Sequence, residues 1–173
     1  SCRLAKILST TDFSLLYDER KDLFFIGYDC EKKAYAEGHY DLYAGEALTT
    51  SYYSVAKRQV PYRHWQKLAK YTVSRGGCFY VKSWTGTMFE YFMPKILLPN
   101  YGGSFSDEML RGVVKQQMKR NKKEVWGNSE SAYYSFDPAL NYQYKAFGVQ
   151  ELALKRGMNE ENVISPYSSW LAL

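Results

Sequence analysis

The chain has 173 residues, a length that supplies one sizeable hydrophobic core and leaves little room for a second. Aromatic residues make up 17 % of the chain, and Tyr alone occurs 17 times; its flat apolar face and polar edge suit both cores and sugar stacking. The formal net charge is +5, but the Lys and Arg residues are scattered apart from a run at 115–123. With no nucleic-acid module signature, we interpret this charge as a solubility feature.

The cysteines Cys2, Cys30 and Cys78 are odd in number, widely spaced and without a Cys-x-x-Cys pair. This pattern argues against a disulfide framework or a zinc site and favours a reducing compartment. No apolar run approaches the roughly 20 residues that cross a bilayer, and no signal peptide opens the chain. We therefore expect a cytoplasmic protein that needs no metal or cofactor. Both ends interrupt a pattern, so we expect the chain to be cut from a larger protein.

The first half of the chain predicts a β-hairpin and two helices. The apolar runs at 14–17 and 23–28 flank the polar turn 18–22, which is typical of a hairpin. A helix is predicted from about 42 to 57, with Asp41 as its N-cap and one face buried. Pro61 is expected to open the next helix, and Gly76–Gly77 to end it. A further helix tail is expected at residues 3–8.

The second half predicts mainly helices joined by aromatic loops. An extended piece at 78–81 leads into a helix at 88–93 that stops near Pro94, where the ring removes a backbone donor. An amphipathic helix is predicted at 107–122, with a cap at Ser106. Short helices are expected near 151–155 and from 167. The pattern favours a mainly α fold with a minor β element.

The stretch 83–94 places an acid, Glu90, among Trp84, Phe89, Tyr91 and Phe92. An ionised carboxylate in that company loses water and gains no obvious cation, so burial favours its protonated form unless a partner is present. Protonated carboxyl groups beside aromatic platforms suit chemistry on sugars. The alternative is a helix start that carries an incidental surface Glu.

Two further acids, Glu46 and Glu130, lie in segments rich in aromatic and small residues. Two carboxylates placed across a glycosidic bond divide the work of acid and nucleophile; a spacing of about 5–5.5 Å gives retention and about 6.5–9.5 Å gives inversion. The alternatives are a first-turn acid for Glu46 and a capping acid for Glu130. His64 is predicted to be a packed core histidine and His39 a loop residue, and no Ser-His-Asp pattern is present.

A series of stretches, taken in chain order, carries a family pattern. They are 16–19 (Leu-Tyr-Asp-Glu), 26–29 (Ile-Gly-Tyr-Asp), 40–47 (Tyr-Asp-Leu-Tyr-Ala-Gly-Glu-Ala), 60–65 (Val-Pro, then His-Trp), 83–94 (Ser-Trp-Thr-Gly-Thr-Met-Phe-Glu-Tyr-Phe-Met-Pro), 126–133 (Trp-Gly-Asn-Ser-Glu-Ser-Ala-Tyr), 142–149 (Tyr-Gln-Tyr, then Phe-Gly-Val), 154–157 (Leu-Lys-Arg-Gly) and 165–167 (Ser-Pro-Tyr). Together they resemble the central glycoamylase-like domain of cyclic β-1,2-glucan synthases, which is akin to endo-β-1,2-glucanases. The resemblance covers nearly the whole chain.

The resemblance implies a portion of an (α/α)6 toroid with a small β-hairpin near the N-terminus, in which residues 1–173 form a single fragment of a larger domain. It implies a glycoside hydrolase or transglycosylase that cuts and rejoins linear β-1,2-glucan into rings. On this analogy Glu130 is the nucleophile and Glu46 the acid/base. Glu90 would then bind sugar hydroxyls or tune the pair, and it is the second choice for a catalytic acid.

The resemblance also implies partners. Trp84, Trp126 and Tyr142 are candidate glucose platforms, and Asp41 and Tyr40 are candidate substrate ligands. β-1,2-Glucan or a related oligosaccharide is the expected substrate, and the remaining domains of a parent at the cytoplasmic face of an inner membrane are expected neighbours. Uncovered helix faces of such a fragment favour a homodimer. The family commonly has Arg where Leu48 stands, and this loss removes a cation that would keep carboxylates ionised.

Rival interpretations remain at this point. The first is a hydrolytic endo-β-1,2-glucanase, in which water replaces the acceptor sugar. The second is a non-catalytic glucan-binding or structural module. A nucleic-acid binder is a third, and it would require a steep salt dependence of DNA affinity.

Overall fold

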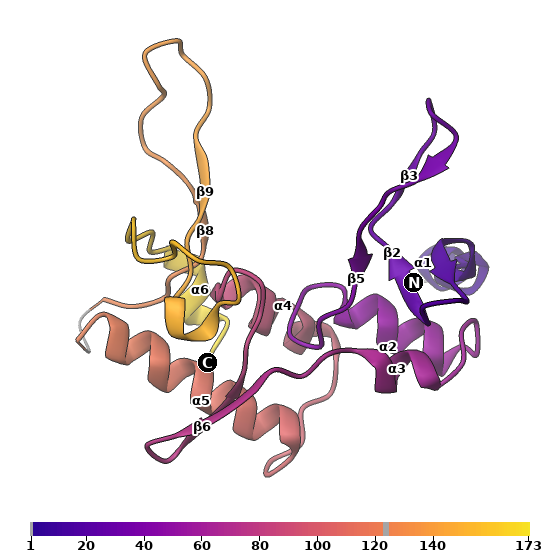
Figure 1. Ribbon diagram of the computed structural model, residues 1–173, viewed down its shortest axis with the longest axis horizontal. Coiled ribbons are helices and arrows are strands. Elements are labelled where there is room, and N and C mark those ends of the chain that lie inside the picture. The colour runs from indigo at the N-terminus through magenta and orange to yellow at the C-terminus, as the bar shows by residue number, and fades with distance from the viewer. Residues whose placement is uncertain (1, 123–124) are drawn as a thin grey trace. The chain divides into compact units, whose positions relative to one another are not determined.

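The computed structural model describes residues 2–122 and 125–173, which fall into two compact units (Figure 1). Unit 1 comprises Ser1–Asp41 and Ala47–Ala69, and unit 2 comprises Leu42–Glu46 and Lys70–Leu173. The chain is 35 % helical and 18 % strand, with several small sheets. It is therefore a mixed α/β structure, and the prediction of a mainly α portion of an (α/α)6 toroid is wrong.

Unit 1 is built around a three-stranded antiparallel sheet with strand order β1-β2-β5. The predicted hairpin is confirmed, because Tyr17 pairs with Phe24 and Asp18 with Leu23 across a polar turn. The turn is held by the Asp18 carboxylate, which accepts hydrogen bonds from the backbone N–H groups of Arg20 (2.9 Å) and Lys21 (3.3 Å). The elements of this unit are α1 (Cys2–Thr10), the 3₁₀ helix η1 (Ser14–Leu16), β1 (Tyr17–Asp18), β2 (Leu23–Phe25), β3 (Tyr28–Asp29), β4 (Ala34–Tyr35), β5 (His39–Tyr40), α2 (Leu48–Ala56) and α3 (Arg63–Lys67).

The helix predicted from residue 42 begins later than expected. Helix α2 starts at Leu48, and its N-cap is Ala47 rather than Asp41. The reason is tertiary: Tyr43 and Ala44 are buried in unit 2, and the Tyr43 hydroxyl lies 2.9 Å from Ser106 Oγ at the start of α5 (Phe105–Arg120). Burial of these two side chains holds residues 42–46 in turns and takes them out of the helix.

Unit 2 contains two antiparallel hairpins and the longest described helix. The prediction that Gly76–Gly77 ends a helix is wrong: both glycines have positive φ, 59° and 71°, and form the turn between two paired strands. This backbone conformation favours glycine, which has no Cβ to clash. The elements are β6 (Thr72–Arg75), β7 (Cys78–Val81), α4 (Met88–Leu97), α5, β8 (Glu130–Ala132), β9 (Tyr144–Ala146), the 3₁₀ helix η2 (Gln150–Leu152) and α6 (Pro166–Trp170).

Helix α5 packs closely on β7. A Cβ added at Gly112 would lie 1.8 Å from the Phe79 carbonyl oxygen, so only glycine permits this approach. Met109, Leu110 and Val113 complete the buried face of the helix. The cap of α5 is Ser104 rather than Ser106, since its hydroxyl accepts from the Asp107 N–H at 3.2 Å.

Helix α4 passes through Pro94 and ends at Leu97, so the predicted stop at Pro94 is wrong. The proline removes only its own N–H, while its carbonyl still accepts from the Leu98 N–H at 2.8 Å. No helix in the described part of the chain is both long and apolar enough to cross a membrane.

Candidate functional site

Glu46 lies in the turn before α2, in the short segment that belongs to unit 2. The segment is anchored by Tyr43, whose ring packs edge-to-face on Phe105 at 5.5 Å. Glu46 itself is exposed. Partial desolvation raises the pKa of its carboxyl group, and the charges of Glu130 and then Glu90 raise it further. The structure therefore brings Glu130 and Glu90 within electrostatic range of Glu46.

Glu90 is the N3 residue of a capping box at the start of α4, in which the Thr87 hydroxyl accepts from the Glu90 N–H. Its carboxylate accepts hydrogen bonds from five donor groups, the hydroxyls of Ser83, Thr85 and Thr87 and the N–H groups of Thr85 and Thr87, at 2.7–3.2 Å. The aromatic sequence neighbours of Glu90 gave no indication of these polar partners. The carboxylate thus organises the loop that carries Trp84.

Glu130 opens β8 and is held at both its backbone and its side chain. Its carbonyl oxygen accepts from Ser165 Oγ at 2.6 Å and from the Tyr167 hydroxyl at 3.2 Å. Its carboxylate accepts from the Tyr144 hydroxyl. The register pairs Glu130 with Ala146 and Ala132 with Tyr144, so Tyr144 is the diagonal neighbour of Glu130 on the same face of the hairpin.

The segment before β8 packs against the start of α4, which places Glu130 near Glu90. The Met88 N–H donates to the Asn128 carbonyl at 3.0 Å, and the Phe89 N–H donates to Ser129 Oγ at 3.1 Å. Asn128 and Ser129 are both buried. Two glutamates that are 40 residues apart in sequence are thus connected through one helix terminus.

The aromatic candidates have different environments. Trp84 and Tyr142 are exposed, whereas Trp126 is half-buried and its carbonyl accepts from Ser169 Oγ at 2.6 Å. Tyr40 ends β5 and belongs, with Asp41, to unit 1. Both are exposed, and the Asp41 carbonyl accepts from the Ala69 N–H at 2.7 Å within that unit.

Sequence reasoning missed Tyr144, Ser165 and Tyr167, the residues that hold Glu130. A signal for Tyr144 was present, since Tyr142-Gln143-Tyr144 alternates with the period of a strand. The donors Ser165 and Tyr167 lie in a stretch that carries the family pattern and the start of a predicted helix, but they reach Glu130 only through folding.

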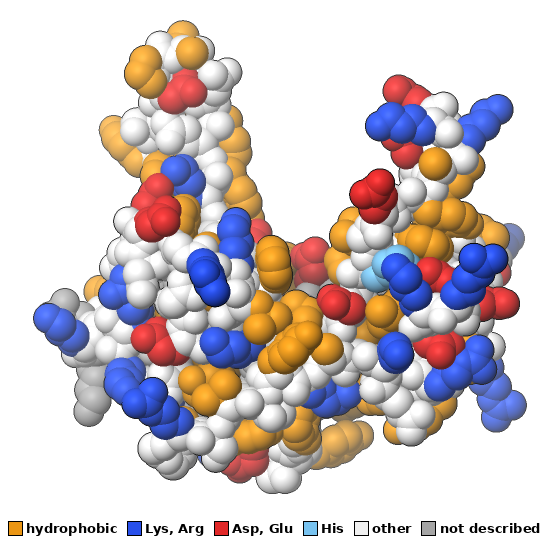
Figure 2. Space-filling model, in the orientation of Figure 1, with side chains coloured by type: hydrophobic (Ala, Val, Ile, Leu, Met, Phe, Trp, Pro, Cys, Tyr) orange, Lys and Arg blue, Asp and Glu red, His pale blue; other side chains and the backbone are white. Residues whose placement is uncertain are grey.

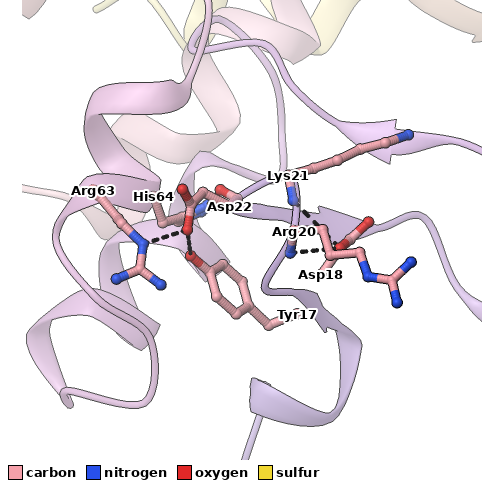
Figure 3. Close-up of polar contacts among 7 residues, drawn as sticks. All are labelled: Tyr17, Asp18, Arg20, Lys21, Asp22, Arg63 and His64. Atoms are coloured by element: carbon pink, nitrogen blue, oxygen red, sulfur yellow. Dashed lines mark hydrogen bonds and ion pairs between the residues drawn. The ribbon is translucent and has the colours of Figure 1, made fainter.

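Unit 1 contains a separate polar network (Figure 3). The Asp22 carboxylate accepts from the Tyr17 hydroxyl at 2.8 Å and from Arg63 Nε at 2.5 Å. Desolvation and this carboxylate raise the pKa of Tyr17 to about 12. His64 is fully buried, which confirms its prediction as a core histidine.

The contacts of His64 assign its tautomer. Nδ1 lies 2.9 Å from the Asp22 carbonyl, which can only accept, so Nδ1 carries the proton. Nε2, 2.9 Å from Ser51 Oγ, is then the acceptor. Ser51 is fully enclosed, so this pair serves the core of unit 1. His39, predicted to be a loop residue, instead lies in β5 and contacts the Asp18 carboxylate at 2.9 Å.

No group of three His, Cys, Asp or Glu side chains within residues 2–122 and 125–173 is arranged to hold a metal ion. The three cysteines are free thiols.

No protein-family model matches the chain. The chain is 38 % identical over 172 residues, 98 % of its length, to cyclic beta-(1,2)-glucan synthase NdvB of Rhizobium meliloti (strain 1021). The match spans only 6 % of the length of that relative. Identity at this level over nearly the whole chain shows that the chain is related to a short segment of this synthase.

Proposed function

We propose that this chain is a catalytic segment of a β-glucan-active glycosidase or transglycosylase, in which Glu46 is the acid/base and Glu130 the nucleophile. The observation that carries the proposal is the coupling of the two acids: the charge of Glu130 raises the pKa of Glu46. Glycoside cleavage requires one carboxyl group that holds its proton beside a second carboxyl group. The relation to a cyclic β-(1,2)-glucan synthase supports β-1,2-glucan as the substrate.

The effect of the Glu130 charge on the pKa of Glu46 serves both steps of the reaction. In the first, protonated Glu46 donates its proton to the glycosidic oxygen while ionised Glu130 attacks the anomeric carbon, so that one C–O bond breaks and a glycosyl ester forms. Ester formation removes the negative charge of Glu130, so the pKa of Glu46 falls when a base is needed. Ionised Glu46 then takes the proton of the incoming hydroxyl, whose oxygen displaces Glu130 from the anomeric carbon.

The identity of the incoming hydroxyl decides the product. A hydroxyl from the same glucan chain closes a ring, a hydroxyl from another chain gives a longer linear product, and water gives hydrolysis. Glu90 acts in this scheme as a tuning residue, because its carboxylate is engaged by five donors of its own loop and its charge adds to that of Glu130 at Glu46.

The setting of the chain is part of the proposal. We place it within a longer protein, because the matching segment is only 6 % of the length of its relative. We also place it on the cytoplasmic side of the membrane. Three free thiols without a disulfide partner support a reducing compartment.

The test is turnover of linear β-1,2-glucan by the full-length protein that carries this chain. Glu130→Gln should abolish turnover while binding persists. The matched control is Glu108→Gln, an exposed glutamate in the first turn of α5, which should turn over normally. Rings among the products indicate transfer, and short linear products indicate hydrolysis. Native turnover by Glu130→Gln would remove this residue from the chemistry, and binding without turnover in the unmodified protein would assign a non-catalytic module.

A further inference from the structure

The β8–β9 hairpin and its loop, residues 130–146, form a long projection from unit 2 that we call the aromatic arm (Figure 1). It begins at Glu130 and returns at Ala146, its pairing partner. Five of its 17 residues are aromatic, namely Tyr133, Tyr134, Phe136, Tyr142 and Tyr144.

The arm presents apolar surface to solvent along its sides and at its tip (Figure 2). Tyr134 is 105 % exposed, Tyr142 66 % and Phe136 61 %. Contiguous apolar surface of this kind is rare on proteins without a partner and marks interaction sites.

The tip of the arm is held by its own hydrogen bonds. The Asp137 carboxylate accepts from the N–H groups of Ala139 (2.9 Å) and Asn141 (2.8 Å) and from the Asn141 side-chain amide (3.1 Å). The Asp137 N–H donates to the Asn141 carbonyl at 3.2 Å. The aromatic side chains are therefore displayed by an ordered loop, which lowers the entropy cost of binding a partner.

The arm offers no free charge to a partner. Its charged residues are Glu130, Asp137 and Lys145; the first is bonded to Tyr144, the second to its own loop, and the third to Glu161 at 2.7 Å. A polyanion would need unpaired cations, so the arm suits a neutral partner.

The pairing register aligns the tyrosines with Glu130. Ala132 pairs with Tyr144, and the Tyr133 N–H donates to the Gln143 carbonyl at 2.8 Å, which carries the ladder one step outward. Side chains two residues apart on a strand share a face, so Tyr144 lies on the face of Glu130, and the exposed Tyr142 and Tyr134 follow beyond the ends of the two strands.

From this arrangement we propose that the aromatic arm binds a neutral glucan chain along the face that starts at Glu130, with Tyr142 and Tyr134 as stacking platforms for sugar units beyond the cleaved bond. The proposal rests on the function proposed above for its substrate. Tyrosine suits this role because its ring covers the C–H face of a pyranose and its hydroxyl remains available to sugar hydroxyls. The arm thereby holds the sugar units that lie beyond the cleaved bond at a distance from the reacting carbon. Only a long glucan chain reaches these platforms, so the arm gives preference to long chains.

The test measures equilibrium binding of long linear β-1,2-glucan by calorimetry, in the full-length protein carrying Glu130→Gln so that no turnover interferes. Adding Tyr142→Ala or Tyr134→Ala should weaken binding by roughly 3- to 10-fold each, the range expected for loss of one stacking contact. Tyr101→Ala, which removes an exposed aromatic of unit 2 outside the arm, should leave binding unchanged. Circular dichroism checks that each variant is folded.

Three outcomes would overturn the proposal. Both arm variants could bind glucan with unchanged affinity, Tyr101→Ala could lose as much affinity as they do, or the arm variants could lose self-association while glucan binding is unchanged. The last, measured by sedimentation, would assign the arm to a homodimer interface. The proposed catalysis fails separately, by native turnover in Glu130→Gln; the arm variants and Tyr101→Ala are then compared through their KM for long linear β-1,2-glucan.

Discussion

The Tyr144 hydroxyl donates a hydrogen bond to the Glu130 carboxylate from the neighbouring strand of the same hairpin. Desolvation and the adjacent carboxylate raise the pKa of Tyr144 above its ordinary value. The phenol therefore stays protonated, and remains a donor, throughout the range in which a glycosidase works. A donor fixed on the carboxylate orients Glu130.

Replacement of Tyr144 by Phe should lower kcat on β-1,2-glucan by about tenfold, since a hydrogen bond to a charged group contributes about 1.5 kcal/mol or more. Tyr134→Phe removes a solvated hydroxyl and is the control. A kcat unchanged in Tyr144→Phe would contradict the positioning role.

Glu46→Gln should abolish turnover and slightly stabilise the folded chain at neutral pH. The pKa of Glu46 is raised on folding, so the folded state holds this proton more tightly than the unfolded state. The contribution of the Glu46 carboxyl group to stability is present at low pH. It is lost as the pH rises from the pKa of Glu46 in the unfolded chain towards its pKa in the folded chain. The gain in Glu46→Gln at pH 7 should be a few tenths of a kcal/mol, because Glu46 is exposed.

Urea unfolding of Glu46→Gln and of the unmodified chain at pH 4 and pH 7 provides the measurement. The two proteins should agree at pH 4 and differ at pH 7. A variant that is less stable at pH 7 would show that Glu46 has a favourable partner and would remove the basis for its role as proton donor.

Glu90→Gln should destabilise the chain by about 1–3 kcal/mol, the range for disrupting charge-assisted hydrogen bonds at a partly buried site. The amide cannot accept from all five donors with both of its heavy atoms. The Trp84 loop should loosen, which Trp fluorescence would report. If Glu90→Gln is as stable as Glu108→Gln, the carboxylate is not what organises this loop.

Gly112→Ala should destabilise the packing of α5 on β7 by 2 kcal/mol or more, roughly, since an added methyl group would overlap the Phe79 backbone. The nearest atoms all belong to the Phe79 backbone, so no flexible side chain can move aside. Gly102→Ala, where an added Cβ meets nothing within 4 Å, is the matched control. Thermal unfolding of the two variants gives the comparison, and equal melting temperatures would refute the close approach.

Unit 1 should lose stability in mild acid through His64. Burial lowers the pKa of this histidine, while the hydrogen bond to the Asp22 carbonyl only partly opposes the effect. A lowered folded pKa means that the unfolded chain takes up the proton first, so stability is lost as pH falls through the unfolded value, near 6.5. His64→Asn should flatten this dependence between pH 7.5 and pH 5 in urea titrations, and a slope that persists would assign it to another group.

Local signals were sufficient for several elements. The hairpin at Tyr17–Asp18 and Leu23–Phe25 follows from two apolar runs around a polar turn, and Cys78–Val81 was expected to be extended. Helix α5 follows from its apolar spacing. The errors lie where tertiary contacts outweigh local preference: at residues 42–46, which are pulled into unit 2 by Tyr43, and at Gly76–Gly77, which turn a strand pair.

The candidate acids were named from sequence because carboxylates among aromatic and small residues are unusual in any fold. Their partners could not be named, since a hydrogen bond from Tyr144 or Ser165 depends on strand register and on a distant segment. Glu90 illustrates the limit, as its sequence neighbours are apolar but its actual contacts are hydroxyl and amide donors.

Residue order alone singled out three candidate carboxylates and the aromatic side chains that accompany them, because residue type and spacing are local properties. Only the tertiary structure decided that the chain is mixed α/β and that Glu130 and Glu90 influence Glu46. It also decided which hydroxyls hold Glu130. Electrostatic coupling depends on distance through space, and segments 40 or more residues apart acquire that distance only by packing together.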